Sequence, residues 1–497
     1  MATIQIQDKV NFRLIIAGII FFIGFISFFD LQPGEPQVTF TAAIGILMAF
    51  WWITEAIPIG ATSLLPLVLF PFMGVMDGKV VAESYINYII FLYIGGFIMA
   101  LSIERWHLHK RIALKILSLL GGSPLRILSG FMLASGILSM WMSNTATAMM
   151  MLPIAFSVIH TLENIYSEAN TQKFASGLLL GIAYGCSIGG IATLVGTPPN
   201  LSFVRIYDIM FPHADPISFG NWFVFAVPLA FILFIFTLWY LYMIYKPGKE
   251  FKPLPGSFFK EEYNKLGRMT PEEKRVFLLF NILVFLWIFR SDITIGNFVL
   301  PGWSRFFSQA SFINDGSIAI FVALLLFILP SSKKDRALAD WKIASGIPWH
   351  IVLLFGGGFA LASGFMKSGL SDYLGHFLVT HLNTGTEGFM IMNTALMSIL
   401  TEFTSNTATT EMMLPIVGGL AKELGTDPLL LMIPVTLAGS MAFMFPIATP
   451  PNAIIFGASK LTIKQMAFTG FLLNIVAVLL ICVFTIFWGA MIFGYSA

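Results

Sequence analysis

The word Ser-Asn-Thr-Ala-Thr at residues 143–147 occurs a second time at residues 405–409. The match continues at the same offset, where Met-Met-Leu-Pro-Ile at 150–154 recurs at 412–416. A second word, Thr-Pro-Pro-Asn, follows each copy, first at Thr197 and again at Thr449. Two words repeated in the same order indicate that the two halves of the chain are duplicated units.

The chain around these words is too apolar for a soluble protein. Of its 497 residues, 57% are hydrophobic and only 11% are charged, which leaves too few charged side chains to cover the surface of a soluble protein. Crossing a hydrocarbon core of about 30 Å takes about 20 apolar residues in a helix. Five apolar cores are long enough, the shorter ones with flanking residues: 14–29, 223–242, 276–289, 318–329 and 471–493. Long apolar runs favour helices over a β-barrel.

Each repeated word is expected to interrupt a helix. Ser, Asn and Thr side chains bond to nearby backbone and favour helix ends over helix interiors. Two consecutive prolines remove two donors and clash with the preceding turn. Non-helical backbone at membrane depth is tolerated only where it is buried in protein or lines a cavity. Paired interruptions in two halves therefore point to the central site of a membrane transporter, and halves with odd numbers of spans would be inverted repeats.

Basic residues fall mostly on alternate connections when the amino terminus is cytoplasmic, as the positive-inside rule requires. The stretch 246–275 is expected to be an exposed cytoplasmic connector, and orientation and anionic lipid explain its charge without nucleic acid. Basic residues alternate between the two sides of the membrane in this way only if the segments near 131–159 and 389–420 are re-entrant hairpins. This gives about eleven spanning helices in a cell membrane, with the carboxyl terminus outside.

The two Ser-Asn-Thr words contain no Lys or Arg. An anionic ligand would therefore be held by amide and hydroxyl donors and by the positive ends of broken helices. Hydroxyl and carbonyl oxygens in the same words also suit a small hard cation. A cation bound beside the anion would offset much of the cost of removing carboxylates from water.

At these residues the chain resembles the divalent anion/sodium symporter family, whose members carry succinate, malate, fumarate, citrate and related anions. The resemblance covers nearly the whole chain and includes Trp-Trp-Ile-Thr-Glu-Ala-Ile-Pro at 51–58. It implies an all-α polytopic membrane protein with inverted repeats, an elevator-type secondary transporter that works as a homodimer. Its partners would be small carboxylate anions, membrane lipid and Na+ as the coupling ion.

The resemblance also implies which residues bind the transported species. Substrate contacts fall on both hairpin tips and the second Thr-Pro-Pro word: Ser143, Asn144, Thr145, Ser405, Asn406, Thr407, Thr449 and Pro450. The first sodium site maps to Ser139, Ser143, Asn144 and Gly196, and the second to Thr401, Thr404, Asn406, Ala448 and Pro450. No basic residue occupies a cation position, which favours sodium coupling over exchange.

The repeats and the implied architecture together predict five regions. They are scaffold helices at 12–127, the first hairpin and broken helix of the transport domain at 128–245, the connector at 246–275, scaffold helices at 276–386, and the second hairpin, broken helix and last helix of the transport domain at 387–497.

Other functions remain open. Sodium-independent exchange of dicarboxylates is the alternative within transport. An ion channel is disfavoured because two non-identical hairpins replace a symmetric ring. An intramembrane enzyme lacks His-Glu-x-x-His, Gly-x-Ser-x-Gly and a convincing acid/base pair.

Three further features have both a functional and a structural interpretation. Glu402 and Glu411, beside the second hairpin tip, are candidates for proton coupling, but an ion pair or a solvated position explains them equally well. His107 and His109 suit a membrane boundary better than a metal site. The triplet at 356–358 is better explained by close helix packing than by phosphate binding.

Overall fold

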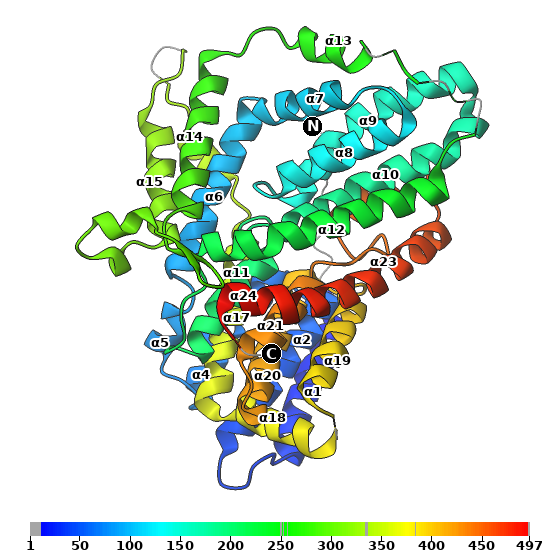
Figure 1. Ribbon diagram of the computed structural model, residues 1–497. Helices are drawn as coiled ribbons and strands as arrows, with labels where there is room; N and C mark the ends of the chain where they lie inside the picture. Colours follow the sequence, from blue (N-terminus) through cyan, green and yellow to red (C-terminus); the bar gives the residue numbers. More distant parts are fainter. Residues whose placement is uncertain are drawn as a thin grey trace. The chain divides into compact units, whose positions relative to one another are not determined.

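The computed structural model of the chain describes residues 11–248, 251, 253–255, 257–332, 336–382 and 384–495 (Figure 1). These residues pack into two compact units, each assembled from three separate segments. Unit 1 contains Met1–Ile90, Ser202–Pro216 and Pro348–Gly439, and unit 2 contains Phe91–Leu201, Ile217–Ile347 and Ser440–Ala497. The first hairpin belongs to unit 2 and the second hairpin belongs to unit 1.

Unit 1 is a bundle of helices around an apolar core. Its helices are α1 (Phe12–Phe28), α2 (Pro36–Thr54), α3 (Ile59–Thr62), α4 (Leu65–Phe72), α5 (Gly78–Glu83), α17 (Trp349–Ser368), α18 (Leu370–His381), α19 (Thr386–Leu400), α20 (Asn406–Leu424) and α21 (Pro428–Ala438). Trp52 of α2, Phe70 of α4 and Phe365 of α17 are buried in the core. A methyl group on Gly357 of α17 would lie 2.5 Å from the carbonyl oxygen of Ser63. The glycine triplet therefore serves close packing, as predicted.

Unit 2 contains the larger share of the chain. Its elements are α7 (Leu108–Leu120), α8 (Pro124–Ser139), α9 (Asn144–Tyr166), α10 (Glu168–Gly190), α12 (Phe219–Tyr245), α13 (Phe258–Lys265), α14 (Pro271–Ile288), β1 (Ile293–Ile295), β2 (Phe298–Leu300), the 3-10 turns Trp303–Phe306 and Ala310–Phe312, α15 (Asp315–Ile328), α16 (Trp341–Ser345), α22 (Pro450–Phe456), α23 (Ile463–Phe484), the π turn Thr485–Gly489 and α24 (Ala490–Phe493). Helices α6 (Tyr88–Arg105) and α11 (Pro198–Met210) continue from one unit into the other.

Helix α10 is the centre of unit 2. Every residue from 174 to 190 is buried, and α8, α9 and α12 pack against it (Figure 1). Four glycines spaced four residues apart, Gly177, Gly181, Gly185 and Gly189, let the neighbours approach. A methyl group on Gly189 would overlap the carbonyl oxygen of Gly136 on α8. The first arm of the hairpin is thus in backbone contact with α10.

Two ion pairs fix the ends of α14 within unit 2. At its start, Arg111 of α7 donates to Glu273 with Nε and Oε1 3.0 Å apart, and Glu273 also completes a capping box with Thr270. At its end, Arg290 lies 2.5 Å from Asp315 at the start of α15. Because the Arg111 and Glu273 side chains are less than 10% exposed, this pair holds α7 firmly to α14.

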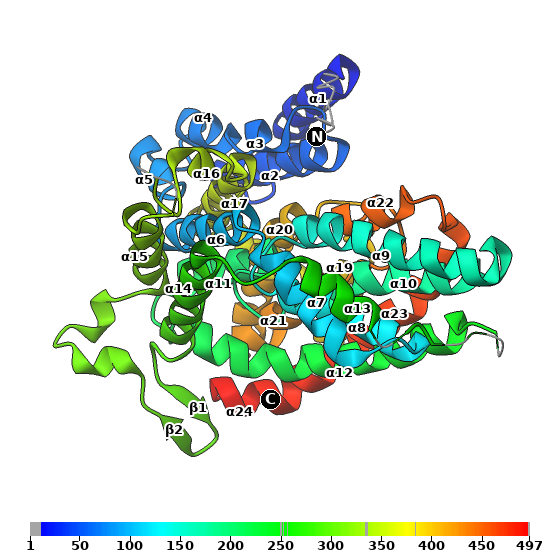
Figure 2. The same ribbon diagram turned by 90° about the horizontal axis from the view of Figure 1, so that it is seen from above.

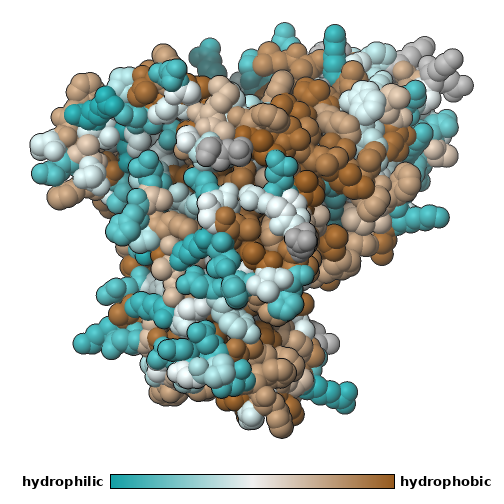
Figure 3. All heavy atoms as spheres, turned by 60° about the horizontal axis from the view of Figure 1, so that its bottom comes forward, coloured by the Kyte–Doolittle hydropathy of each residue, from teal (hydrophilic) through white to brown (hydrophobic). Residues whose placement is uncertain are grey.

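The surface is apolar enough to face lipid. Among the described residues, six helices are long and apolar enough to span a membrane: Pro36–Thr54, Gly78–Arg105, Asn144–Tyr166, Phe219–Tyr245, Trp349–Ser368 and Ile463–Phe493. Five shorter apolar helices accompany them. Figure 3 shows apolar side chains covering broad areas of one face. Exposed residues such as Phe231, Phe285 and Phe487 lie on different helices. The prediction of an all-α polytopic membrane protein is confirmed.

Two local elements were not predicted. Strands β1 and β2 form an antiparallel hairpin in which Ile295 pairs with Phe298, and Gly296 N donates to the carbonyl of Met491 beside it (Figure 2). The connector 246–275 contains α13, and Leu254 and Phe259 are buried, so the connector is partly packed and not fully exposed. The division into two compact units shows which helices pack together and not which helices move. The expected division into scaffold and transport domains therefore remains a prediction.

Candidate functional site

Both Ser-Asn-Thr words lie where a helix is interrupted. In unit 2, α8 ends at Ser139 and α9 begins at Asn144. In unit 1, α19 ends at Leu400 and α20 begins at Asn406. The interruption predicted from the side chains of these words is therefore confirmed in both copies.

The two hairpin tips are held by the same hydrogen bond. Ser139 Oγ donates to Asn144 Oδ1 at the first tip. Thr401 Oγ1 lies 2.6 Å from Asn406 Oδ1 at the second. The repeat offset aligns Ser139 with Thr401 and the two asparagines with each other. In each tip a hydroxyl at the end of one arm orients the asparagine that begins the next.

The start of each second arm presents backbone amides. Ser143 caps α9, where its Oγ accepts from Ala146 N at 3.1 Å. Ser405 stands in the same position before α20, but its side chain makes no capping bond. The partial positive charge of a helix amino terminus favours an anion at this end. Asn144 and Asn406, each the first residue of its helix, stand at that end.

Both Thr-Pro-Pro-Asn words also lie at interruptions, and both belong to unit 2. Helix α10 ends at Gly190 and α11 begins at Pro198, while α22 begins at Pro450. Thr449 caps α22 by accepting from Asn452 N at 3.3 Å. Proline at the first helical position is suited to these starts because its missing N–H would have no partner there.

The residues of the first predicted sodium site come together in unit 2. A methyl group on Gly196 would overlap the carbonyl oxygen of Gly190 and lie 3.0 Å from that of Ser139. A methyl group on Gly190 would lie 2.9 Å from Asn144 Oδ1 and 3.3 Å from the carbonyl oxygen of Gly196. The backbone carbonyls of Ser139, Gly190 and Gly196 and the side-chain amide of Asn144 thus lie close together, and we call this group the oxygen cage. Such neutral, hard oxygen donors fit a small cation. Ser143, the fourth residue predicted for this site, caps α9.

The residues of the second predicted site fall in both units. In unit 1, Thr401 Oγ1 lies 2.8 Å from the carbonyl oxygen of Gly439, and Thr404 Oγ1 lies 2.7 Å from that of Leu400. Ala448 and Pro450 belong to unit 2. Thr401 and Asn406 are therefore brought together, whereas the hydroxyl of Thr404 lies beside that of Thr409.

The predicted substrate residues show the same division. Ser143, Asn144, Thr145, Thr449 and Pro450 lie in unit 2, where α22 packs against α9. Ser405, Asn406 and Thr407 begin α20 in unit 1. Asn144 and Asn406 are half-buried. Their roles stay a prediction.

Sequence reasoning missed several polar residues at the interruptions of unit 2. Buried Thr193 donates from Oγ1 to the carbonyl of Met140 at 2.5 Å and accepts from Gly196 N at 3.1 Å. Asn200 and Asn452, both fully buried, donate to carbonyls of the unwound segments. The asparagines belong to the repeated words and could have been found, whereas no local pattern marks Thr193.

The two glutamates beside the second tip are not solvated. Glu402 is 1% exposed and Glu411 is fully buried, so the solvated position considered for them is wrong. Ser202 Oγ donates to Glu411 Oε1 at 2.9 Å. Gly358 makes room for the carboxyl group, because a methyl there would overlap it.

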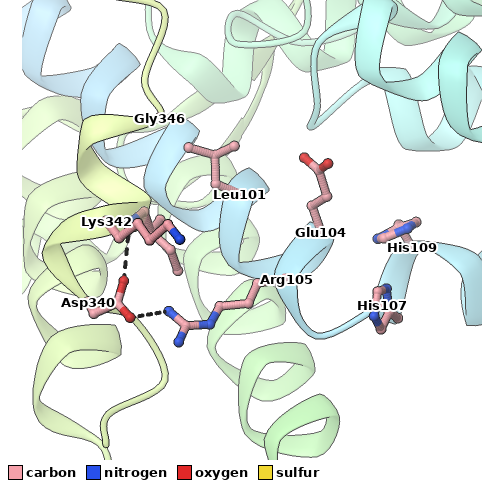
Figure 4. Close-up of a pocket in the computed structure, with 9 residues that line it drawn as sticks. Leu101, Glu104, Arg105, His107, His109, Asp340, Lys342 and Gly346 are labelled. Carbon is pink, nitrogen blue, oxygen red and sulfur yellow. Dashed lines mark hydrogen bonds and ion pairs between the residues drawn. The ribbon is translucent and has the colours of Figure 1, made fainter. Parts of the chain in front are cut away.

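A cavity of about 600 Å³ lies elsewhere in unit 2, at the end of α6 (Figure 4). Arg105 and Asp340 point toward one another across it, 2.8 Å apart. Lys342 and Glu104 also line it, so its formal charges cancel. Burial lowers the pKa of His109, and the described residues contain no cluster of three metal-ligating side chains. The cavity contains none of the repeated words.

Comparison with known proteins agrees with the fold. A family model described as the sodium:sulfate symporter transmembrane region matches residues 8–495. The sodium-dependent dicarboxylate transporter SdcS of Staphylococcus aureus strain NCTC 8325 / PS 47 is 42% identical over 475 residues, which cover 94% of this chain and 89% of SdcS. SdcS of strain COL aligns with the same values.

Two solved structures share the fold at low sequence identity. Neisseria gonorrhoeae MtrF, from a class of antimetabolite efflux pumps, has a TM-score of 0.51 and 12% identity, and the match covers 93% of this chain and 97% of MtrF. The Alcanivorax borkumensis YdaH transporter has a TM-score of 0.54 and 11% identity, and the match covers 88% of this chain and 97% of YdaH.

The helical membrane fold and the paired interruptions define a multi-pass transport protein and not an enzyme. The chain belongs to the sodium:sulfate symporter family. The resemblance seen in the repeated words is thereby confirmed.

Proposed function

We propose that this protein is a secondary active transporter that imports C4-dicarboxylates such as succinate, malate and fumarate, or related di- and tricarboxylates, together with Na+. The observation that carries the proposal is the pair of interrupted hairpins, each with an asparagine at its tip held by a hydroxyl five residues earlier. The 42% identity to a sodium-dependent dicarboxylate transporter supports the choice of substrate and ion.

The substrate carboxylates bind to neutral donors. Amide and hydroxyl groups of both hairpin tips and of the second Thr-Pro-Pro word hold them, from Ser143, Asn144, Thr145, Ser405, Asn406, Thr407 and Thr449, with Pro450 beside them. The amino termini of α9 and α20 contribute partial positive charge. Neutral donors release a dianion more readily than fixed arginines would, because no full charge is left unpaired when it departs.

Sodium supplies the missing positive charge. The first ion binds at Ser139, Ser143, Asn144 and Gly196, and the second at Thr401, Thr404, Asn406, Ala448 and Pro450. Asn144 and Asn406 each belong to a proposed cation site and to the proposed substrate site, so each side chain contacts both a sodium ion and the substrate. Cation binding thereby favours substrate binding, and by linkage the reverse also holds.

The proposed architecture is based on the two duplicated halves of the chain. About eleven helices span the membrane with two re-entrant hairpins as inverted repeats, the amino terminus in the cytoplasm and the carboxyl terminus outside. The protein forms a homodimer, and an elevator movement carries the transport domain (128–245 and 387–497) past scaffold helices 12–127 and 276–386, with the connector 246–275 in the cytoplasm.

Equilibrium binding of labelled succinate to the purified protein tests the proposal. We expect saturable binding in sodium chloride and at least tenfold weaker binding in choline chloride of equal ionic strength. Equal binding in both salts would contradict sodium coupling and favour dicarboxylate exchange. Absence of saturable binding in either salt would contradict a dicarboxylate substrate.

A further inference from the structure

Asn200 is one of the side chains that hold the unwound segment before α11. Asn200 is fully buried, and its Nδ2 lies 2.8 Å from the carbonyl oxygen of Thr193 and 3.4 Å from that of Ile191. These carbonyls belong to the segment between α10 and α11. Because this segment is not helical, no backbone N–H four residues further on donates to them. Asn200 therefore replaces the missing helical donor at Thr193, and it shares the carbonyl of Ile191 with Trp222, whose Nε1 lies 3.1 Å from that oxygen.

The unwound segment before α22 is held in the same way. Asn452 is fully buried, and its Nδ2 lies 3.1 Å from the carbonyl oxygens of both Ala442 and Phe445. Each asparagine is the third residue of its helix, after two prolines. Each also reaches the carbonyl seven residues before it. The same device thus occurs in both halves of the chain.

The segment held by Asn200 leads directly to the oxygen cage. Thr193, whose carbonyl accepts from Asn200, uses its hydroxyl to accept from Gly196 N and to donate to the carbonyl of Met140. Gly196 and Gly190 supply two of the cage carbonyls. A change at Asn200 would therefore alter the position of the cage through Thr193, without Asn200 itself belonging to the predicted cation set.

The segment held by Asn452 leads to the second predicted cation set in the same way. Phe445, whose carbonyl accepts from Asn452, also accepts from Ala448 N at 3.2 Å. Ala448 and Pro450 are predicted ligands of the second ion. Holding Phe445 therefore holds the turn that carries them.

Each asparagine also keeps one oxygen free. Asn200 Oδ1 and Asn452 Oδ1 are buried without a hydrogen-bond partner among the described residues. An unpaired buried acceptor costs about 1 to 3 kcal/mol. The two halves of the chain are thus matched in this acceptor as well as in the bonds donated by Nδ2.

From these contacts we infer that Asn200 and Asn452 are positioning residues, one for each sodium site, which fix the unwound backbone so that its carbonyls face the ion. The inference rests on the proposed sodium-coupled function and extends it to two residues outside the predicted binding sets. Replacement by Asp keeps the size of the side chain but puts a second acceptor where the amide donates, and this repels both carbonyls.

Sodium-induced thermal stabilisation of the purified, dicarboxylate-free protein measures the effect directly, because a ligand of the folded state raises the melting temperature by an amount set by its concentration relative to its dissociation constant. We expect Asn200→Asp and Asn452→Asp each to raise the half-saturating sodium concentration by about tenfold or more, the usual effect of losing a group that orients metal ligands. At saturating sodium, the KM for succinate uptake should stay within about twofold, since these residues do not touch the substrate in this account.

Two further variants keep the inference testable. Thr193→Val retains the shape but removes the hydroxyl that links Asn200 to the cage, and it should weaken sodium binding even if Asn200→Asp does not fold. Asn393→Ala is the matched control, because among the described residues this buried amide donates to the carbonyl of Phe389 in its own helix and to no other group. It should lower the melting temperature without changing the sodium midpoint.

The outcomes separate the two proposals. In one outcome, sodium stabilises the wild-type protein and the half-saturating sodium concentration is unchanged in Asn200→Asp, Asn452→Asp and Thr193→Val. This result would overturn the positioning role and leave the proposed function intact. A wild-type protein that sodium chloride stabilises no more than choline chloride would overturn the proposed sodium coupling and this inference with it.

Discussion

At the scale of single residues, the proposed function depends on two asparagines that begin helices. Asn144 and Asn406 each accept from a hydroxyl five residues earlier, Ser139 and Thr401. In the proposed site their amide nitrogens donate to the anion, while the oxygens accept from the two hydroxyls. One side chain can therefore contact the cation and the substrate together.

Replacing either asparagine by alanine should abolish sodium-dependent succinate uptake and leave folding and membrane insertion intact, because the residues are only half-buried. Uptake into proteoliposomes, normalised to the amount of monodisperse protein, measures this. Asn281→Ala is the control, since this exposed amide bonds only to Phe277 in its own helix. Wild-type uptake by Asn144→Ala or Asn406→Ala would disprove the site assignment.

At the scale of helices, the glycines of α10 set how closely the first hairpin packs. Gly189→Ala should destabilise the protein by about 1 to 3 kcal/mol, the usual cost of adding atoms to a packed interior, because the new methyl overlaps Gly136 of α8. Thermal unfolding in detergent measures the loss. Gly24→Ala on α1, where a methyl group meets nothing within 4 Å, should leave the melting temperature unchanged or slightly raise it. Equal melting temperatures for the two variants would contradict the packing.

The ion pair between α7 and α14 gives a second prediction about helices. Arg111→Ala would leave Glu273 buried without its partner, and losing one member of a buried pair costs about 3 to 5 kcal/mol. Arg111→Lys should recover only part of this, because the single ammonium of lysine lacks the planar fork with which Arg111 donates to both carboxylate oxygens. The control is Lys265→Ala, which removes an exposed pair with Glu262 and should change the melting temperature little. A stability loss in Lys265→Ala equal to that in Arg111→Ala would show that burial is not the cause.

The sequence predicted the helix interruptions because their cause is local. Proline and side chains that compete for backbone hydrogen bonds act on their own turn. The β1–β2 hairpin was missed although Gly296-Asn297 between two short apolar runs is a hairpin signal. Asn200 lies in a repeated word and could have been found as a candidate residue, unlike Thr193. The hydrogen-bond partners of both residues could not be predicted, because those partners lie in unwound segments whose course depends on tertiary packing.

At the scale of the whole molecule, the family assignment rests on a match across residues 8–495. The apolar surface and the long helices agree with it. Which helices move, and how many chains assemble, do not follow from packing within one chain. The elevator and the homodimer therefore stay proposals, and light scattering in detergent should give the protein mass of two chains and not one.

The most direct measurement is uptake of labelled succinate into proteoliposomes containing the purified protein. Vesicles with an inward sodium gradient are compared with sodium-free vesicles preloaded with succinate. We predict accumulation above the external concentration only with the sodium gradient, and its loss when sodium is equal on both sides. Accumulation that needs internal succinate and no sodium would contradict symport and leave the proposed sodium sites without their role.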